Sequence, residues 1–159
     1  MADTHSYQVT VEWTGNLGSG TGSYRSYSRD HEILADGKTP IAASSDPAFR
    51  GDRKRWNPEE LLVASVAQCH MLWYLHLCAT DGVVVVDYED RAHGVMTMDE
   101  SGGGGQITEV VLSPEVTVTD PSMVEKALAL HGDVHSVCFI ARSVNFPIRH
   151  SPVIRVQRD

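Results

Sequence analysis

Apolar and polar residues alternate in the first third of the chain and then change to a helical pattern. Residues 7–13 (Tyr-Gln-Val-Thr-Val-Glu-Trp) alternate strictly, which predicts a half-buried strand. Residues 15–22 contain four glycines and predict a turn. A second strand is expected around Tyr24 and Tyr27, and a third near residues 40–43. The N-terminal third is therefore predicted to be β-structure.

A long helix is the strongest local prediction. Asn57 is a favourable N-cap, Pro58 suits the first helical position, and Glu60 completes a capping box. Residues 59–79 contain no helix breaker, and Asp81-Gly82 provides a stop. The segment is apolar on nearly every side, which is typical of a helix buried all round. One small domain can hardly enclose such a helix, so we expect a partner chain to cover part of it in a homodimer.

The remainder of the chain predicts further strands and a second helix. This helix is expected to begin at Asp120-Pro121, with a short helical turn near residues 138–143. The expected strands and turns are a strand over 83–98, a hairpin tip at 101–105, a strand over 107–119 with a bulge or edge at Ser113-Pro114, and a closing strand over 153–156. The order predicts an α+β fold in a single domain, residues 1–159.

Composition and charge narrow the class of protein. The 159 residues are 42% apolar and 21% charged, which is the balance of a soluble globular protein. The net charge of −8 argues against nucleic acid or an anionic membrane as the main partner. No apolar run is expected to cross a bilayer, and residues 1–6 do not resemble a signal peptide. We therefore expect a cytoplasmic protein with reduced thiols.

The three cysteines are the main candidates for chemistry. Cys69 lies midway along the long helix, and Cys138 follows the second helix, where nearby backbone amides would lower its thiol pKa. Cys78, among apolar residues near the end of the long helix, is expected to be a small buried hydrophobe. His70 directly follows Cys69, but adjacent helical residues point about 100° apart. It is therefore not expected to act as the base of Cys69.

The run Asn57-Pro58-Glu59-Glu60-Leu61-Leu62, with Cys69 ten residues after Glu59, resembles the OsmC/Ohr family of osmotically inducible and organic hydroperoxide resistance proteins. The later segment His135-Ser136-Val137-Cys138 fits the same pattern. The resemblance covers most of the chain. It implies an OsmC-like fold, with antiparallel sheets wrapped around long central helices in an intertwined homodimer. It also implies a thiol-dependent peroxidase of the oxidative stress response, with no cofactor.

The resemblance assigns roles to individual residues. Cys69 is implied to be the peroxidatic cysteine, Cys138 the resolving cysteine, and Glu59 a partner of an arginine that keeps the thiolate reactive. Dithiols, with lipoylated proteins as favoured donors, are the implied reductants. About 15 Å of helix separates Glu59 from Cys69. If Glu59 serves Cys69, it must therefore act through an arginine or from a partner chain.

The identity of that arginine is where this sequence departs from the family. Phe49 occupies the position at which the OsmC branch has arginine, so we expect the neighbouring Arg50 to serve, with Arg53 as the second choice. Arg25 and Arg29 are the nearest counterparts of the arginine in the Ohr branch. Phe139 also stands where the classical branches have proline after the resolving cysteine. These departures indicate a distinct branch and leave the natural peroxide and reductant open.

Two other functions fit the same residues. His131, His135 and Cys138, completed by Cys69, have spacing that suits a metal site; the alternative for both histidines is a surface or interface position. The apolar helix and its aromatic residues would also suit a non-catalytic dimer that binds an apolar ligand. For the peroxidase, an apolar pocket favours organic hydroperoxides over hydrogen peroxide, because each buried methylene contributes about 0.8 kcal/mol.

Overall fold

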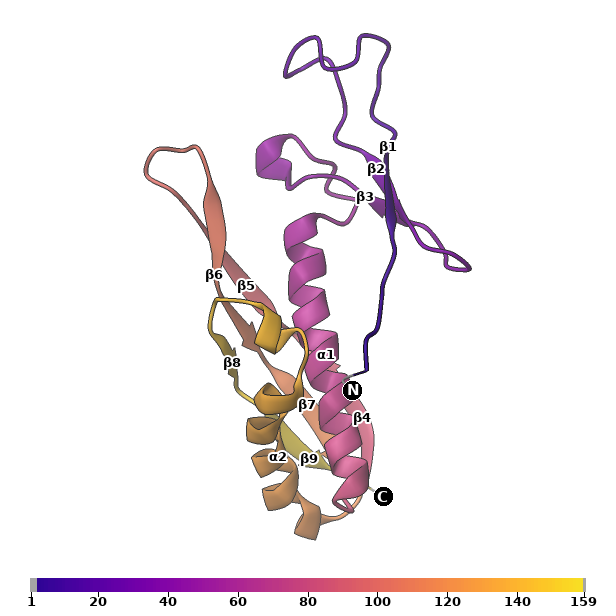
Figure 1. Cartoon of the computed structure of the whole chain (residues 1–159). Helices are drawn as coiled ribbons and strands as arrows, with labels where there is room; N and C mark the ends of the chain where they lie inside the picture. The colour runs from indigo at the N-terminus through magenta and orange to yellow at the C-terminus, as the bar shows by residue number, and fades with distance from the viewer. Residues whose placement is uncertain (1–2, 159) are drawn as a thin grey trace. The chain divides into compact units, whose positions relative to one another are not determined.

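The computed structural model describes residues 3–158, which form two compact units (Figure 1). The first unit, residues 3–61, contains strands β1 (Thr10–Trp13), β2 (His31–Leu34) and β3 (Ile41–Ala43), a 3₁₀ turn at Pro47–Phe49, and the beginning of helix α1 (Pro58–Thr80). The second unit, residues 62–158, contains the rest of α1 and all later elements. The expectation of one domain stays a prediction.

The first unit is built on an antiparallel sheet in the order β1-β2-β3. The strand expected at Tyr24 and Tyr27 is wrong, because these residues lie in turns before β2. The guanidinium of Arg29 lies 4.4 and 4.1 Å from their ring centroids and donates to both of their carbonyl oxygens. These contacts stabilise a loop in place of a strand ladder. β1 is shorter than predicted, and its four residues are exposed, not half-buried.

Helix α1 begins and ends within one residue of the predicted range. The amide of Glu60 donates to Oδ1 of Asn57 at 2.8 Å, and the amide of Asn57 donates to Oε2 of Glu60 at 3.2 Å. These two bonds form the predicted capping box. At the other end Gly82 adopts φ +76°, and the amide of Val83 donates to the carbonyl of Cys78 at 2.9 Å. The sequence signals at both ends of the helix are therefore confirmed.

The burial of α1 differs from the prediction. Its fully buried side chains form one stripe with a repeat of four residues: Val66, His70, Tyr74 and Cys78. The other apolar side chains are half-buried or exposed, with Leu72 59% exposed. The second unit covers only one side of the helix, so the single chain does not bury α1 all round. By length and composition alone α1 could span a membrane, contrary to our expectation, but the core helix of a soluble protein passes the same test.

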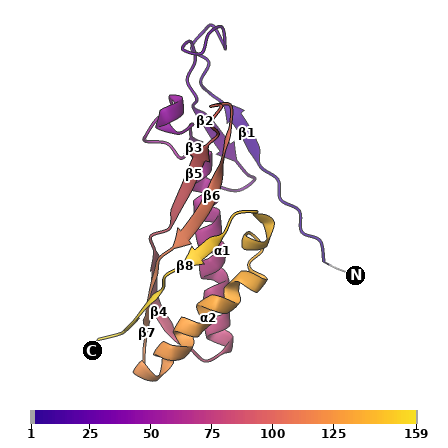
Figure 2. The same ribbon diagram turned by 90° about the vertical axis from the view of Figure 1, so that its left-hand side faces the viewer.

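The strands of the second unit form two three-stranded sheets (Figure 2). One has the order β4-β7-β9 (Val85–Asp90, Pro114–Val118 and Val153–Val156), and the other the order β5-β6-β8 (His93–Met98, Gly105–Leu112 and Ile148–His150). Pairs β4–β7 and β5–β6 are antiparallel, but β6–β8 and β7–β9 are parallel. The expectation of antiparallel sheets therefore holds for the sheet of the first unit and for β4–β7 and β5–β6, but it is wrong for β6–β8 and β7–β9. β8 and β9 return after a helical crossover, which permits parallel pairing.

Polar and proline residues divide the two long predicted strands. The segment 83–98 separates into β4 and β5 at residues 91–92, and the amide of Ser113 donates to Oδ1 of Asp90 at 2.7 Å beside this break. Pro114, which has no N–H to donate, begins β7 at the predicted irregularity. Gly94 of β5 leaves room for α1, since a Cβ atom there would lie 2.5 Å from Cγ2 of Val63. Strand β8 was not predicted.

Helix α2 (Val124–Val137) covers the main core of the second unit. The side chain of Asp120 caps the preceding 3₁₀ turn, Pro121–Met123, by accepting from the amide of Ser122. A further 3₁₀ turn, Ala141–Ser143, follows α2, as expected. The buried members of this core come from α1, α2, β7 and the adjoining turns: Tyr74, Cys78, Val83, Val116, Val118, Ala127, Leu130, Val134, Cys138 and Ala141. This packing places the end of α2 against the middle of α1.

Candidate redox site

Two of the three cysteines lie in contact at the junction of α1 and α2. The sulfur atoms of Cys69, in α1, and Cys138, at the C-terminal end of α2, are 2.7 Å apart, and all three cysteines are free thiols. Cys69 is partly buried and Cys138 is 1% exposed. Cys78 is buried in the core, as expected of a small hydrophobe. The chain therefore brings together two thiols that are 69 positions apart in sequence.

The surroundings of Cys138 keep its thiol protonated at neutral pH. Burial raises the pKa of Cys138 to about 11, and the neighbouring Cys69 acts in the same direction. The amide of Ala141, 3.4 Å from the sulfur, and the amide of Ile140 oppose this rise. The backbone amides are thus present as predicted, but burial outweighs them and the expected lowering of this pKa is wrong. A protonated, buried thiol fits a resolving cysteine better than an initial nucleophile.

Two buried histidines, His70 and His131, lie beside the cysteine pair, and the exposed His150 adjoins them. Nε2 of His70 and Nδ1 of His131 are 2.9 Å apart in nearly coplanar rings. Tyr74 stacks on His131 with 3.8 Å between ring centroids, and His150 of β8 lies 5.8 and 6.1 Å from the rings of His70 and His131. Nε2 of His131 is buried, with no hydrogen-bond partner among residues 3–158. His70 therefore points toward α2, which agrees with its exclusion as the base of Cys69.

These histidines line a small cavity together with Cys138. The cavity has a volume of about 70 Å³ and is lined by Val66, His70, Leu112, His131, His135, Cys138, Ala141, Ile148 and His150. Burial, with a smaller repulsive effect of His150, lowers the pKa of His70 to about 4. Burial, with smaller effects of His70 and His150, lowers that of His131 to about 3. Both rings are therefore neutral at pH 7.

The histidines do not form the metal site considered from the sequence. Across the described part of the chain, residues 3–158, no group of three or more histidine, cysteine, aspartate or glutamate side chains is arranged to hold a metal ion. His131 faces His70, and Cys138 contacts Cys69. His135 is largely exposed, so the two histidines have different surroundings despite their helical spacing.

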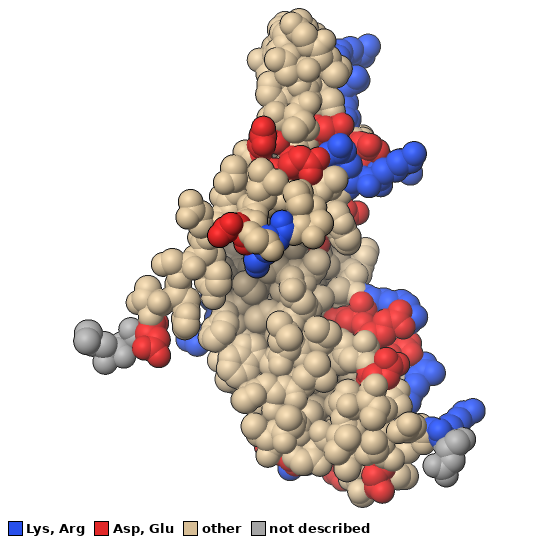
Figure 3. Space-filling view, turned by 90° about the vertical axis from the view of Figure 1, so that its right-hand side faces the viewer, with Lys and Arg blue, Asp and Glu red and all other residues tan. Residues whose placement is uncertain are grey.

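An apolar surface adjoins the cysteine pair. Trp73 lies one turn after Cys69, Phe139 directly follows Cys138, and their ring centroids are 5.4 Å apart. A shallow depression of about 220 Å³ is lined by Leu72, Trp73 and His76. Phe139 is 65% exposed, so this apolar surface is open to a ligand. Many of the charged side chains on the face in Figure 3 lie along one margin, with others scattered over its upper half, and much of its lower half is uncharged.

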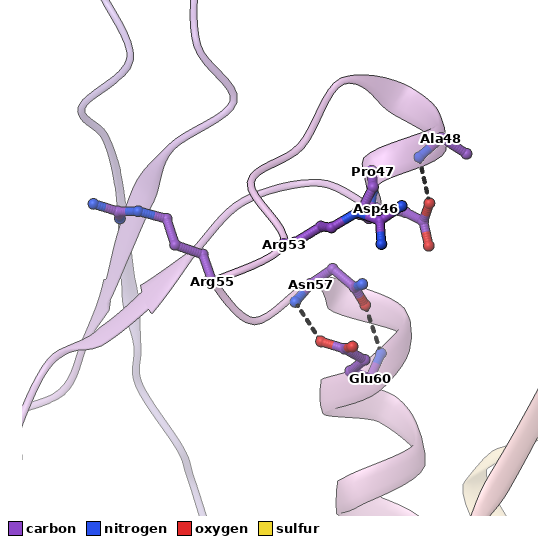
Figure 4. Close-up of a pocket in the computed structure, with 7 residues that line it drawn as sticks. All are labelled: Asp46, Pro47, Ala48, Arg53, Arg55, Asn57 and Glu60. Atoms are coloured by element: carbon purple, nitrogen blue, oxygen red, sulfur yellow. Dashed lines mark hydrogen bonds between the residues drawn. The ribbon is translucent and has the colours of Figure 1, made fainter.

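The first unit has a groove that is lined by one of the candidate arginines, Arg53 (Figure 4). This open groove of about 710 Å³ is lined by Asp46, Pro47, Ala48, Arg53, Arg55, Asn57 and Glu60. Arg53 extends toward the turn at residues 46–48, whereas Arg55 points away and pairs with Asp30 and Glu32 at 3.7 and 3.1 Å. Arg55 is therefore committed to the sheet, and Arg53 is directed into the groove.

Arg50 and Glu59 are each unusual in the first unit. Arg50 adopts φ +68°, the one positive value outside glycine in residues 3–158. Oε2 of Glu59 is buried with no hydrogen-bond partner among these described residues. Arg29 is engaged by Tyr24 and Tyr27, and Arg25 is exposed. Cys69 and Cys138 are in contact in the second unit, whereas Arg50, Arg53 and Glu59 belong to the first unit.

The histidine cluster was only partly visible from the sequence. His70 and Tyr74 belong to the buried four-residue repeat of α1, which a count of helical spacing from Val66 to Cys78 would have revealed. The pairing of His70 with His131, and the approach of His150, depend on α2 and β8. No local pattern identifies such partners, because they are 61 or more positions away along the chain.

Comparison with known proteins agrees with this architecture. A sequence profile of the OsmC-like protein family matches residues 51–152. An OsmC-like protein of unknown function from Vibrio cholerae has a similar structure, with a TM-score of 0.83, 29% identity, and coverage of 94% of this chain and 100% of that one. Among curated proteins, no sequence matches this chain.

Two solved structures of organic hydroperoxide resistance proteins share the fold at lower identity. The protein from Elizabethkingia anophelis has a TM-score of 0.67 at 17% identity, and the match covers 98% of this chain and 100% of that one. The protein OhrB of Bacillus subtilis has a TM-score of 0.59 at 22% identity, with 95% and 98% covered. The family profile spans most of the chain, and the fold agrees with it. The chain therefore belongs to the OsmC-like protein family.

Proposed function

We propose that this protein is a thiol-dependent peroxidase that reduces organic hydroperoxides through Cys69 and Cys138. The observation that carries the proposal is the 2.7 Å contact between the two sulfur atoms. Two thiols in contact are placed to form a disulfide once one of them is oxidised. Similar folds named organic hydroperoxide resistance proteins make the peroxide the first substrate to test.

The reaction requires one oxidation by the peroxide, one condensation of the two cysteines and one reduction. The Cys69 thiolate attacks the peroxide, the O–O bond breaks, and an alcohol leaves after protonation, with Cys69 oxidised to a sulfenic acid. The Cys138 thiol then attacks the sulfenic sulfur, releasing water and forming the Cys69–Cys138 disulfide. A dithiol, such as a lipoylated protein, reduces this disulfide and is itself oxidised. The buried, protonated Cys138 fits the second step, and the more accessible Cys69 fits the first.

Arg50 and Glu59 are proposed to support the Cys69 thiolate. A free thiol is only a few per cent ionised at neutral pH, so a nearby cation is needed. A residue held at positive φ without being glycine is uncommon and frequently marks a functional site, which favours Arg50 over Arg53. The unpartnered, buried oxygen of Glu59 calls for a cationic or hydrogen-bonding partner. An arginine beside Glu59 would meet both needs.

We further propose that the active protein is a cytoplasmic homodimer. In the single chain, α1 leaves Leu72 and other apolar side chains uncovered on the sides away from its buried stripe. A second copy that packs against these sides would bury them. It would also offer a second source of arginine and glutamate side chains. An intertwined arrangement of the two long helices is consistent with both requirements.

Turnover of cumene hydroperoxide with a dithiol tests the function. We expect Cys69→Ser to abolish turnover, and Cys138→Ser to accumulate a sulfenic acid that dimedone traps. Cys78→Ala is the matched control, since this buried cysteine lies outside the pair, and it should retain turnover. Absence of turnover with every dithiol would contradict the proposal. Binding of an apolar ligand in the depression at Leu72 and Trp73, unaffected by Cys69→Ser, would then become the better function.

A further inference from the structure

A series of polar contacts connects α1 and the residue after it to α2. From one contact to the next, the position moves toward the N-terminus of α1 and toward the C-terminus of α2. Toward the C-terminal end of α1, the contacts are a salt bridge between Asp81 and Lys126 at 3.3 Å and a hydrogen bond from the Tyr74 hydroxyl to the Ala127 carbonyl at 3.0 Å. At the middle of α1, the contacts are those between His70 and His131 and between Cys69 and Cys138. The contact between Cys69 and Cys138 is therefore the last of this series. The distance between the two sulfur atoms is expected to depend on the contacts that precede it.

The pair of His70 and His131 is the buried polar contact nearest to the cysteines. His70 directly follows Cys69, and His131 lies two turns of α2 before Cys138. His131 is 0% exposed and His70 5% exposed, and apolar side chains surround the pair. Apolar packing tolerates small shifts, whereas a hydrogen bond requires a distance of about 2.7–3.2 Å and a narrow range of angles. This pair therefore fixes how the two helices meet.

Stacking and neutrality hold the pair in one arrangement. The ring of Tyr74 lies 3.8 Å from that of His131 at an angle of 10°, and the two imidazoles are coplanar within 6°. Since burial keeps both rings neutral at pH 7, one ring donates its N–H and the other accepts. Whichever ring donates, Nε2 of His131 is left over, and it is buried without a partner among residues 3–158.

The cavity beside His131 has room for that missing partner. Its volume of about 70 Å³ is large enough to hold a water molecule. Its lining includes His131, His70, His150 and Cys138, so a water there has polar neighbours. A water bonded to Nε2 would complete the hydrogen bonds of His131 and would adjoin the wall of the cavity that Cys138 forms.

We propose that His70 and His131 are positioning residues for the cysteine pair. Their hydrogen bond, completed by a cavity water on Nε2 of His131, holds the Cys138 sulfur within reach of Cys69 and so sets the rate of disulfide closure. The role in turnover rests on the proposed peroxidase function. In the closing step the Cys138 sulfur attacks the sulfenic sulfur of Cys69, the S–O bond breaks, and the thiol proton leaves with the hydroxide as water.

Thiol–disulfide equilibrium tests this role without any peroxide. The equilibrium of the Cys69–Cys138 disulfide with dithiothreitol reports the effective concentration of one thiol at the other. We expect His131→Leu to lower this concentration at least about tenfold, because an error of about 1 Å in positioning costs up to about 100-fold. His131→Asn, which keeps a polar atom near the position of Nδ1, should retain it within about threefold. His93→Gln, at an exposed position of β5, should leave it unchanged.

A double variant separates positioning from stability. In the variant with both His70→Leu and His131→Leu, neither ring leaves an unpaired partner, so its unfolding midpoint should exceed that of His131→Leu. Its effective concentration should nevertheless stay low, because the directional hydrogen bond is missing. Recovery of the effective concentration in the double variant would overturn the proposal, since shape alone would then position the thiols. If His131→Leu does not fold, the double variant is compared with His70→Gln and His131→Asn.

The peroxidase cycle provides the second measurement. The sulfenic acid of Cys69 should form at the wild-type rate in His131→Leu but decay to the disulfide at least about tenfold more slowly. A wild-type rate of decay, or a wild-type dithiothreitol equilibrium, would overturn the positioning role alone. Absence of a sulfenic acid in Cys138→Ser would instead overturn the peroxidase function, while the dithiothreitol equilibrium would still decide whether the histidines position the thiols.

Discussion

The two units of this chain differ in whether their candidate residues are in contact with a partner side chain. In the second unit, Cys69 and Cys138 are in contact, because α2 packs against α1 and polar contacts fix the two helices. In the first unit, Oε2 of Glu59 is buried without a partner, and neither Arg50 nor Arg53 has an ion-pair partner within residues 3–158. The redox pair is thus built within one unit, whereas no arginine pairs with Glu59 among residues 3–158.

Beyond the two cysteines, the largest expected effects on activity come from Glu59 and the arginine that it holds. Glu59→Gln should lower kcat/KM for cumene hydroperoxide about 100-fold, because the neutral amide cannot hold an arginine beside the thiolate. The control is Glu60→Gln, which keeps the capping box with Asn57 and should change kcat/KM less than about twofold. Steady-state kinetics of the two variants decide the question, and an equal effect of both would show that helix capping alone is involved.

Acid should destabilise the second unit through its histidine pair. The pKa values of His70 and His131, about 4 and 3, lie below the ordinary value of 6.5, so the unfolded chain binds these protons first as the pH falls. The unfolding free energy contributed by the pair is complete above about pH 6.5 and decreases toward about pH 4. We expect a loss on the order of 2–4 kcal/mol between about pH 6.5 and pH 5.

Urea unfolding at several pH values measures this dependence. The titratable groups that face the pair are His150 from β8, His135 and Cys138 from α2 and its end, and Tyr74 from α1. His131→Asn should remove about half of the pH dependence, whereas His93→Gln should leave it intact. An unfolding free energy that is independent of pH between about pH 7 and pH 5 would contradict the neutral, buried state of the two rings.

The arginines allow a direct comparison within the first unit. Arg50→Ala should lower kcat/KM about 100-fold at pH 7, with recovery at alkaline pH, where a free thiol ionises without a cation. Arg53→Ala should have a smaller effect. Arg55→Ala should act on stability instead, since Arg55 pairs with Asp30 and Glu32. A pH-dependent loss in Arg53→Ala but not in Arg50→Ala would transfer the role to Arg53.

The smallest expected effect concerns the choice of peroxide. Phe139→Ala removes part of the apolar surface beside the cysteines and should raise KM for cumene hydroperoxide about threefold, while kinetics with hydrogen peroxide stay unchanged. The effect is modest because Phe139 is 65% exposed before any ligand binds. Parallel assays with both peroxides measure the preference. An equal change for both would show that Phe139 positions Cys138 and does not select the substrate.

Local signals in the sequence determined the elements and the candidate cysteines. The capping box of Asn57 and Glu60 and the glycine at residue 82 set the ends of α1, because caps act through hydrogen bonds only a few residues long. Sequence likewise separated Cys78 from the other two cysteines by its apolar surroundings. It failed at Tyr24 and Tyr27, where contacts with Arg29 override a strand pattern.

Only the tertiary structure decided which distant side chains meet. The sequence placed Cys69 and Cys138 on two helices, but the 2.7 Å contact depends on the packing of α2 against α1. The bond between His70 and His131 and the parallel entry of β8 likewise depend on segments far apart in the chain. The physical reason is that caps and periodicity reflect interactions within a few residues, whereas burial and pairing across the core depend on how whole elements pack.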